Sequence, residues 1–423
     1  MAKKKEAEMS TVDEVVEDLL GELNKHATSS KAYMQGDHAN HTWGIEIPFV
    51  AMQWLVGGSS VLPAQRYIGV SGQRKSYKST MMVELGNWFI QNNGVHIYLD
   101  TENKTSPSML DAMTWWNGIQ TLNRRLYKVC GSITEWQTLV TRSVENARAT
   151  GIRPKGSRVP IYACVDSLMG RSTEEADREL RKEGAAKERG FPVSSLQITN
   201  YLEALNLLGT TMSVGWVQHM KESMEQTSYG GKQYKEKGPQ ASQFSCSVHL
   251  RVNKGSPIRE ADRDGAPFPG VTVEGYELWV KTEMSCLGPD KRVLPVDLCW
   301  QYVDCTDDEG KTYRRQVMWF DWHAALGKLL VRMKYDEKML YAKERGALAE
   351  TIHFVEAKKN SIKCEALGLD GASYHAFGKA IDDNIEMRDQ LSRFLGITEF
   401  QTIQDADIDF EAGRLAAKKT KGR

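Results

Sequence analysis

The sequence predicts an α/β fold with a mainly parallel sheet. Short apolar segments, each ending at a polar residue, alternate with segments of helical period. These apolar segments are Tyr67–Val70, Val95–Leu99, Val159–Val165 and Thr211–Val217. Such alternation is typical of parallel strands that are covered by helices on both faces. Because ligands of parallel sheets bind beyond the carboxyl ends of the strands, one ligand could touch all four ends.

The first apolar segment runs into a candidate phosphate-binding loop. Gly72, Lys78 and Ser79 match the motif G-x-x-x-x-G-K-[ST], whereas Tyr77 stands where the second glycine is expected. In such a loop, backbone N–H groups and the following helix N-terminus converge on a phosphate. Taken alone, the pattern also fits a chance Gly…Lys-Ser match. The candidate binding residues are Gly72, Gln73, Arg74, Lys75, Ser76, Tyr77, Lys78, Ser79 and Thr80.

Composition limits the class of protein. A chain of 423 residues predicts two or three structural units, and 41% hydrophobic content is globular. Lys+Arg equals Asp+Glu, so contact with nucleic acid must be judged from local charge. The seven cysteines form no C-x-x-C pair, which disfavours a zinc module or a disulfide framework and favours a reducing cytosol. With no signal peptide and no apolar span, we expect a soluble cytoplasmic protein without a membrane partner.

Three regions are expected along the chain. Residues 1–42 contain a basic leader and an amphipathic helix from Thr11 to Leu23, which either packs on its own domain or docks on a neighbouring subunit during polymerisation. Residues 43–321 form the α/β core. Residues 322–423 are expected to form a small helical region with a basic tail.

Two polar stretches interrupt the core. Residues 171–190 are densely charged and fit a solvated helix or loop. Residues 221–243 lack an apolar period, so a flexible loop is expected there. This second stretch carries Tyr229, Tyr234 and several lysines, which suit phosphate contacts and stacking on the bases of a nucleic-acid strand. Its lysines are Lys221, Lys232, Lys235 and Lys237.

Further strands are expected after this stretch. Phe244–Val252 alternates like a strand, and Tyr276–Val280 is a second candidate. Asp297–Val303 and Arg314–Phe320 are expected to form a hairpin across a turn that contains Asp307 and Gly310.

Polar residues at the strand ends could supply the chemistry of phosphoryl transfer. Lys78 would reach the terminal phosphates, the Ser79 hydroxyl would bind Mg²⁺, and Asp166 would hold the ion or one of its waters. Glu102 would orient and deprotonate the attacking water, since its strand is expected to neighbour the loop strand. Each residue type is common at strand ends, so the prediction depends on their combination.

Gln218 and His219 end the fourth apolar segment, immediately before the lysine-rich stretch. Either side chain could sense the γ-phosphate and pass the state of the nucleotide to residues 221–243. This contiguity offers a route from nucleotide binding to polymer binding.

The order of these motifs resembles the RecA-type recombinases, and most closely the UvsX-like recombinases of phages. That family tolerates an aromatic residue in the loop at the position where Tyr77 stands. The D-x-E setting of the family's catalytic Glu is similar to Asp100-Thr101-Glu102, and its strand-Asp-Ser element is similar to Asp166-Ser167. Its nucleotide sensor corresponds to Gln218, with His219 as the neighbouring candidate.

The resemblance covers about residues 43–303 and leaves some positions open. Residues 238–252 look like the exit of the second DNA-binding loop into a strand. Lys281 lies where RecA supplies a lysine to the nucleotide of a neighbouring subunit, but Glu283 replaces the second lysine of that segment. No adenine-stacking aromatic residue is evident, and Met109 is the nearest candidate.

The resemblance implies an ATP-dependent DNA recombinase with ATP and Mg²⁺ as cofactors and Glu102, Lys78 and Gln218 as catalytic residues. It implies a helical filament of identical subunits on single-stranded DNA that pairs with double-stranded DNA, assisted by a single-strand-binding protein or a loading mediator. If the chain is phage-encoded, it would act in the cytoplasm of the host cell. The alternatives are a RecA-fold helicase or regulatory ATPase, and a filament or scaffold protein that does not hydrolyse ATP.

Overall fold

The structure is a computed structural model. It describes residues 43–64, 66–116, 124–150, 159–168, 190–205, 212–226, 232–236, 241–307, 309–335, 352–358, 361–399 and 401–402. The expected N-terminal helix, the charged stretch at 171–189 and the basic tail lie outside these residues.

The described elements follow one another from Trp43 to Thr402. The first half of the chain supplies β1 (Trp43–Glu46), α3 (Val50–Leu55), β2 (Val61–Pro63), β3 (Tyr67–Gly72), α4 (Lys78–Gln91), β4 (Val95–Asp100), α5 (Pro107–Trp116), β5 (Arg125–Val129), α6 (Ile133–Thr150), β6 (Ile161–Asp166) and α8 (Gly190–Ala204). The second half supplies β7 (Met212–Gln226), β8 (Lys232–Glu236), α9 (Ala241–Ser245), β9 (Val248–Glu260), β10 (Val273–Ser285), β11 (Val293–Thr306), β12 (Thr312–Asp321), α10 (Trp322–Tyr335), β13 (Val355–Lys358), β14 (Ser361–Cys364), a short 3-10 helix (Glu365–Leu367), β15 (Leu369–Ala372), α12 (Tyr374–Asp383), α13 (Ile385–Phe394) and β16 (Gln401–Thr402).

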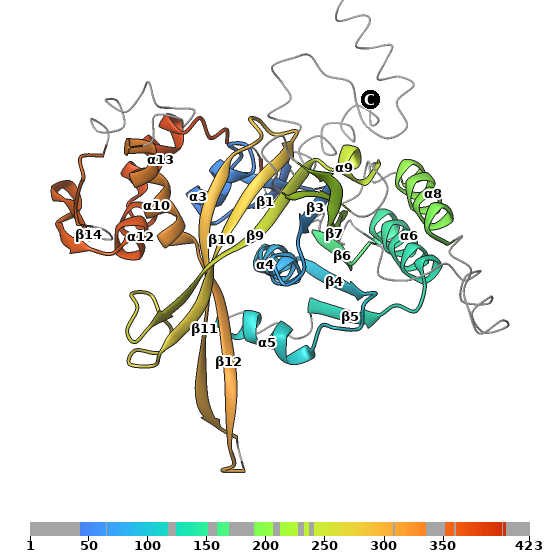
Figure 1. Ribbon diagram of the computed structural model, residues 1–423, viewed down its shortest axis with the longest axis horizontal. Helices are drawn as coiled ribbons and strands as arrows, with labels where there is room; N and C mark the ends of the chain where they lie inside the picture. The colour runs from blue at the N-terminus through green and yellow to red at the C-terminus, as the bar shows by residue number, and fades with distance from the viewer. Residues whose placement is uncertain are drawn as a thin grey trace, which may run out of the picture.

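A large mixed sheet forms the centre of the described chain (Figure 1). Its strand order is β12-β11-β10-β9-β3-β7-β6-β4-β5, and β8 pairs with β7 beside this path. Strands β9, β3, β7, β6, β4 and β5 run parallel to their neighbours in this series, whereas β10, β11 and β12 are antiparallel. The predicted α/β class with a mainly parallel core is therefore confirmed.

One expectation about strand neighbours is wrong. β4, which precedes Glu102, does not pair with β3, because β7 and β6 lie between them. The sequence order of two strands does not fix their order in a sheet, since helical crossovers can insert later strands between earlier ones.

Helices cover both faces of the parallel strands. Tyr98 and Leu99 are consecutive in β4 and point to opposite faces. Tyr98 belongs to a buried cluster with α4 and α5, whereas Leu99 belongs to a second cluster with α6 and α8. The buried strands read as continuous apolar runs because each face has its own apolar cover.

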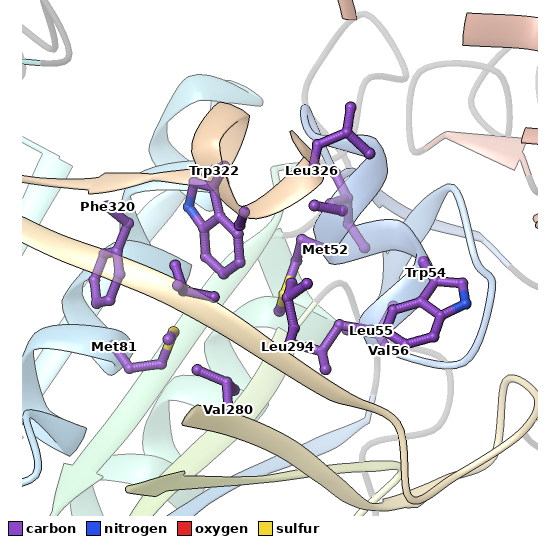
Figure 2. Packing of buried hydrophobic residues seen from close by; sticks show 14 of the residues in the cluster. Met52, Trp54, Leu55, Val56, Met81, Val280, Leu294, Phe320, Trp322 and Leu326 are labelled. Atoms are coloured by element: carbon purple, nitrogen blue, oxygen red, sulfur yellow. The ribbon is translucent and has the colours of Figure 1, made fainter. Parts of the chain in front are cut away.

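The first buried cluster also reaches the C-terminal region. Figure 2 shows side chains of α3, α4, β10, β11, β12 and α10 meeting in it, with Trp322 beside Phe320 and Leu326. Phe377 and Ile381 of α12 and Leu391 of α13 belong to the same cluster. The described C-terminal residues are therefore packed on the core that carries β3 and α4.

The C-terminal region is not purely helical, which corrects the expectation. Among its described residues, α10, α12 and α13 are helices, but β13, β14 and β15 make a small antiparallel sheet, and β16 pairs in parallel with β1. These strands have at most four residues, which is too short for the alternation in Val355–Lys358 and Ser361–Cys364 to stand out as a periodic signal.

The β11–β12 and β7–β8 hairpins test two further expectations. The predicted pairing of β11 with β12 is confirmed, and these long strands project from the body in Figure 1. Residues 221–243 were expected to be a flexible loop, but their described part continues β7 to Gln226, forms β8 and enters α9. Extended backbone pairing can order a polar segment without an apolar pattern, which is why sequence periodicity missed it.

In the described part of the chain, no helix is both long and apolar enough to span a membrane.

Candidate functional site

The candidate phosphate loop connects β3 to α4. Gly72 ends β3 in a crowded position, where an added Cβ would lie 2.2 Å from the Val252 carbonyl oxygen and 2.6 Å from Ser76 Oγ. Tyr77 precedes the first turn of α4 with a left-handed φ of 64°. The chain therefore turns tightly between these two residues and directs the N-terminus of α4 at the space that the loop encloses.

Lys78 is folded back onto its own loop. Its ammonium group donates to the Gln73 carbonyl oxygen at 2.5 Å and lies 3.5 Å from Ser76 Oγ. Burial lowers the pKa of Lys78 to about 8, and the carboxylates of Asp166 and Glu102 oppose this lowering. A phosphate group would replace the carbonyl as the partner of this ammonium ion and favour its charged form.

A cavity of about 880 Å³ lies in front of this loop, beyond the carboxyl ends of β3, β4 and β6 and beside His219 and Met220 in the middle of β7. It brings together Lys78, Ser79, Asp166, Glu102 and His219. Its full lining is Arg74, Lys75, Ser76, Tyr77, Lys78, Ser79, Thr80, Asp100, Thr101, Glu102, Lys104, Thr105, Met109, Asp166, His219 and Met220.

Gln218 and Lys281 are outside this lining, and so are the loop residues Gly72 and Gln73. Gln218 is 2% exposed, and its Oε1 accepts a hydrogen bond from Ser242 Oγ at 3.2 Å. Lys281 lies in β10 and pairs with Glu283 at 3.1 Å. Within this single chain, His219 is therefore the candidate sensor that faces the cavity.

Ser79 and Asp166 are suited to hold a magnesium ion. The Ser79 side chain hydrogen-bonds to the Asp166 carboxylate, which also accepts from the Tyr98 hydroxyl. Burial raises the pKa of Asp166, while these two hydrogen bonds favour its ionised form. Among the described residues, no three acidic, histidine or cysteine side chains gather as a complete metal site. A Mg²⁺ ion would therefore need phosphate oxygens and water beside these two ligands, which is its usual coordination in nucleotide sites.

The loop that carries Glu102 is organised by Asp100. The buried carboxylate of Asp100 accepts backbone hydrogen bonds from Glu102, Asn103, Lys104 and Thr105 at 2.7 to 3.1 Å. The Tyr127 hydroxyl donates to the same carboxylate at 3.0 Å. These bonds curl the chain at the end of β4 and fix the direction of the Glu102 side chain.

Glu102 has three polar partners. His219 Nε2 lies 2.5 Å from its Oε1, Ser167 Oγ donates to the same oxygen at 2.7 Å, and Lys104 Nζ pairs with Oε2 at 2.6 Å. The hydrogen bond from His219 is the main reason that the pKa of Glu102 lies well below its usual range. A carboxylate held in this way is ionised but weakly basic, so it gains basicity when a donor leaves.

The β7–β8 hairpin joins this site to the neighbouring strands. Met220, which follows His219, pairs with Glu236 of β8. The Glu236 carboxylate accepts from Gln243 Nε2 at 2.8 Å and lies 3.3 Å from Nε2 of the buried His249. The base of the hairpin is thereby anchored on β9 and α9.

Sequence reasoning named Asp100 and Ser167 only as neighbours of Glu102 and Asp166, without a role, and it did not single out Lys104. The signal for Asp100 was present, because an aspartate at a strand end commonly accepts backbone N–H groups of the following turn. Ser167 and Lys104 carried no such signal, since serine and lysine are ordinary surface residues.

Comparison with known proteins assigns no family: no protein-family model matches the chain, and no curated protein matches it.

Proposed function

We propose that this chain binds and hydrolyses ATP and uses the nucleotide to act as a RecA-type DNA recombinase. The observation that carries the proposal is the meeting of Lys78, Ser79, Asp166 and Glu102 around one cavity at the carboxyl edge of the sheet. A loop cation, a hydroxyl with a carboxylate, and a further acid are the groups that phosphoryl transfer requires.

The residues would divide the work as follows. Lys78 and the N-terminus of α4 bind the terminal phosphates and stabilise the charge that develops on them. Ser79 and Asp166 hold Mg²⁺, which when bound neutralises phosphate charge. Glu102 orients the attacking water and accepts its proton, for which at least one of its present donors must withdraw.

DNA binding is proposed for the β7–β8 hairpin. His219 lines the cavity from β7, and the part of β7 after His219 pairs with β8 to form the hairpin. The sequence places Lys221 in β7 and Lys232 and Lys235 in β8. A movement of His219 on nucleotide binding would shift the start of the hairpin, because Met220, the next residue of β7, is the first to pair with β8. ATP binding would favour an extended filament on single-stranded DNA, and hydrolysis would release it.

The primary test is ATP turnover measured with and without single-stranded DNA. We expect turnover that rises with DNA and is lost in Lys78→Ala, because the phosphate-binding cation is removed. Lys379→Ala, at an exposed lysine of α12 paired with Asp383, is the matched control and should behave like the wild type. Wild-type protein that neither binds nor hydrolyses ATP would refute the proposal.

Electron microscopy of the protein with single-stranded DNA and a slowly hydrolysed ATP analogue separates the recombinase from its alternatives. Nucleotide-dependent helical filaments are expected. Closed rings would favour the helicase, and filaments without ATP turnover would favour the scaffold.

A further inference from the structure

Tyr77 occupies an unusual position for a tyrosine. It is the residue before α4 and has a left-handed φ of 64°, a conformation that non-glycine residues adopt infrequently and with strain. Its own side chain makes no capping hydrogen bond to the helix. Something other than helix capping must therefore hold this residue in place.

The aromatic side chains of Tyr276 and Trp300, in the antiparallel strands, pack against Tyr77 and stabilise it. The Tyr77 ring centroid lies 5.7 Å from that of Tyr276 in β10 and 6.1 Å from that of Trp300 in β11. Tyr276 and Trp300 are themselves 5.9 Å apart, so the three rings form a closed triangle. Lys254 Nζ lies 3.4 Å from the centroid of Tyr276 and 5.8 Å from that of Tyr77. These separations are those of favourable aromatic and cation–π pairs.

The triangle adjoins the cavity at one corner only. Tyr77 lines the cavity, whereas Tyr276 and Trp300 do not. The next residue along the chain is Lys78, whose ammonium group is folded back onto the Gln73 carbonyl within the loop. A bound phosphate would compete with the Gln73 carbonyl for this ammonium group, directly beside Tyr77 in the chain.

We propose that Tyr77 is a positioning residue that fixes the phosphate loop against Tyr276 and Trp300, and that nucleotide binding is transmitted through it to the antiparallel strands. The inference rests on the proposed function, because it requires a nucleotide at the loop. In the common motif a glycine adopts the left-handed conformation before the helix without strain. Here the packing of the three rings offsets the strain of that conformation in Tyr77. It also gives the loop a contact with β10 and β11 that a glycine could not make.

The first experiment measures affinity for a fluorescent ATP analogue and steady-state turnover in Tyr276→Ala and Tyr276→Phe. Loss of the ring should weaken nucleotide affinity by about three- to tenfold, which corresponds to the usual worth of an aromatic pair. We expect a higher KM with kcat nearly unchanged, because Tyr276 touches the loop and not the cavity. Tyr276→Phe should restore the wild-type value. Tyr313→Ala is the matched control, since Tyr313 lies on β12 and is 43% exposed.

The second experiment uses Trp300 as a reporter in a conservative variant. ATP should change the tryptophan emission of the wild type, and Trp300→Phe should remove most of that change while it retains nucleotide binding. This readout does not depend on whether Tyr276→Ala folds.

The outcomes separate the inference from the function on which it rests. A wild type that binds no nucleotide overturns both. A wild type that binds ATP while Tyr276→Ala keeps wild-type affinity, or Trp300→Phe keeps the full emission change, overturns the inference alone.

Discussion

His219 Nε2 and Glu102 Oε1 lie 2.5 Å apart, although β6 lies between β4, which precedes Glu102, and β7, which contains His219. The contact joins the end of β4 to the beginning of the β7–β8 hairpin. It places the candidate base and the candidate sensor in direct contact, so that a change in either one changes the electrostatic environment of the other.

The Glu102→Gln variant should retain nucleotide binding and lose turnover. An amide cannot accept the proton of the attacking water, and general-base catalysis commonly contributes about 10²- to 10⁴-fold. Binding of a fluorescent ATP analogue and phosphate release measure the two properties separately. Glu365→Gln, at a glutamate with an 86% exposed side chain, is the control. Turnover that survives in Glu102→Gln would remove Glu102 from the catalytic role.

Replacement of His219 should shift the acid limb of the pH–rate profile. The His219 hydrogen bond stabilises ionised Glu102 and lowers its pKa, so the wild type should keep a charged carboxylate in moderately acidic solution. In His219→Ala the pKa of Glu102 rises, and kcat/KM should begin to fall at a higher pH. His219→Gln, which keeps a donor, should shift the limb less. The nucleotide's own titration is common to all variants and cancels in the comparison.

Nucleotide affinity should decline above about pH 8. The pKa of Lys78 is lowered to about 8 by burial, so the free protein progressively loses this positive charge as the pH rises through that value. Binding must then include protonation of Lys78, and affinity should fall by up to about tenfold for each further pH unit. Titrations from pH 7.5 to 9.5 test this. Lys78→Arg is the control, because its guanidinium stays charged and should show no such decline.

Glu84 should make the protein less stable as the pH rises from about 4.5 to 7. It is buried in α4, where the Trp322 indole donates to Oε1 at 3.0 Å, and burial raises the pKa of Glu84 from 4.5 to about 7. The folded state therefore retains a proton that the unfolded state releases, so stability falls between about pH 4.5 and 7. Glu84→Gln should remove this fall and gain about 3 kcal/mol over the wild type at pH 8, since one pKa unit is worth about 1.4 kcal/mol. Denaturant titrations at pH 5 and 8 check it, and an equal difference at both pH values would contradict the assignment.

Gly378→Ala should destabilise the contact between α10 and α12. A Cβ at Gly378 would meet the His323 carbonyl oxygen at 1.9 Å, which forces the helices apart. Overpacking of this kind typically costs about 1–3 kcal/mol. The melting temperature measures the effect, and Gly310→Ala is a comparison without a steric neighbour, although its φ of 81° carries a backbone cost of its own. A wild-type melting temperature in Gly378→Ala would show that the helices can separate freely.

The sequence predicted the α/β class because each buried strand is a continuous apolar run, and it predicted the β11–β12 hairpin because a polar, glycine-containing turn separates two strand-like segments. It also selected Lys78 and Ser79 from the loop motif, and Glu102, Asp166, Gln218 and His219 because polar residues at the ends of parallel strands can reach a common edge. These predictions depend on local pattern, which the chain order carries directly.

Only the tertiary structure decided how the strands are ordered, and therefore that Glu102 reaches the cavity across β7 and β6 rather than from beside β3. It decided that His219 and not Gln218 faces the cavity, and that Tyr77 packs on Tyr276 and Trp300. The contacts of Glu102 with His219 and of Tyr77 with Tyr276 and Trp300 join residues more than a hundred positions apart. Contacts between such distant residues produce no hydrophobic periodicity in the sequence, so pattern analysis could not predict them.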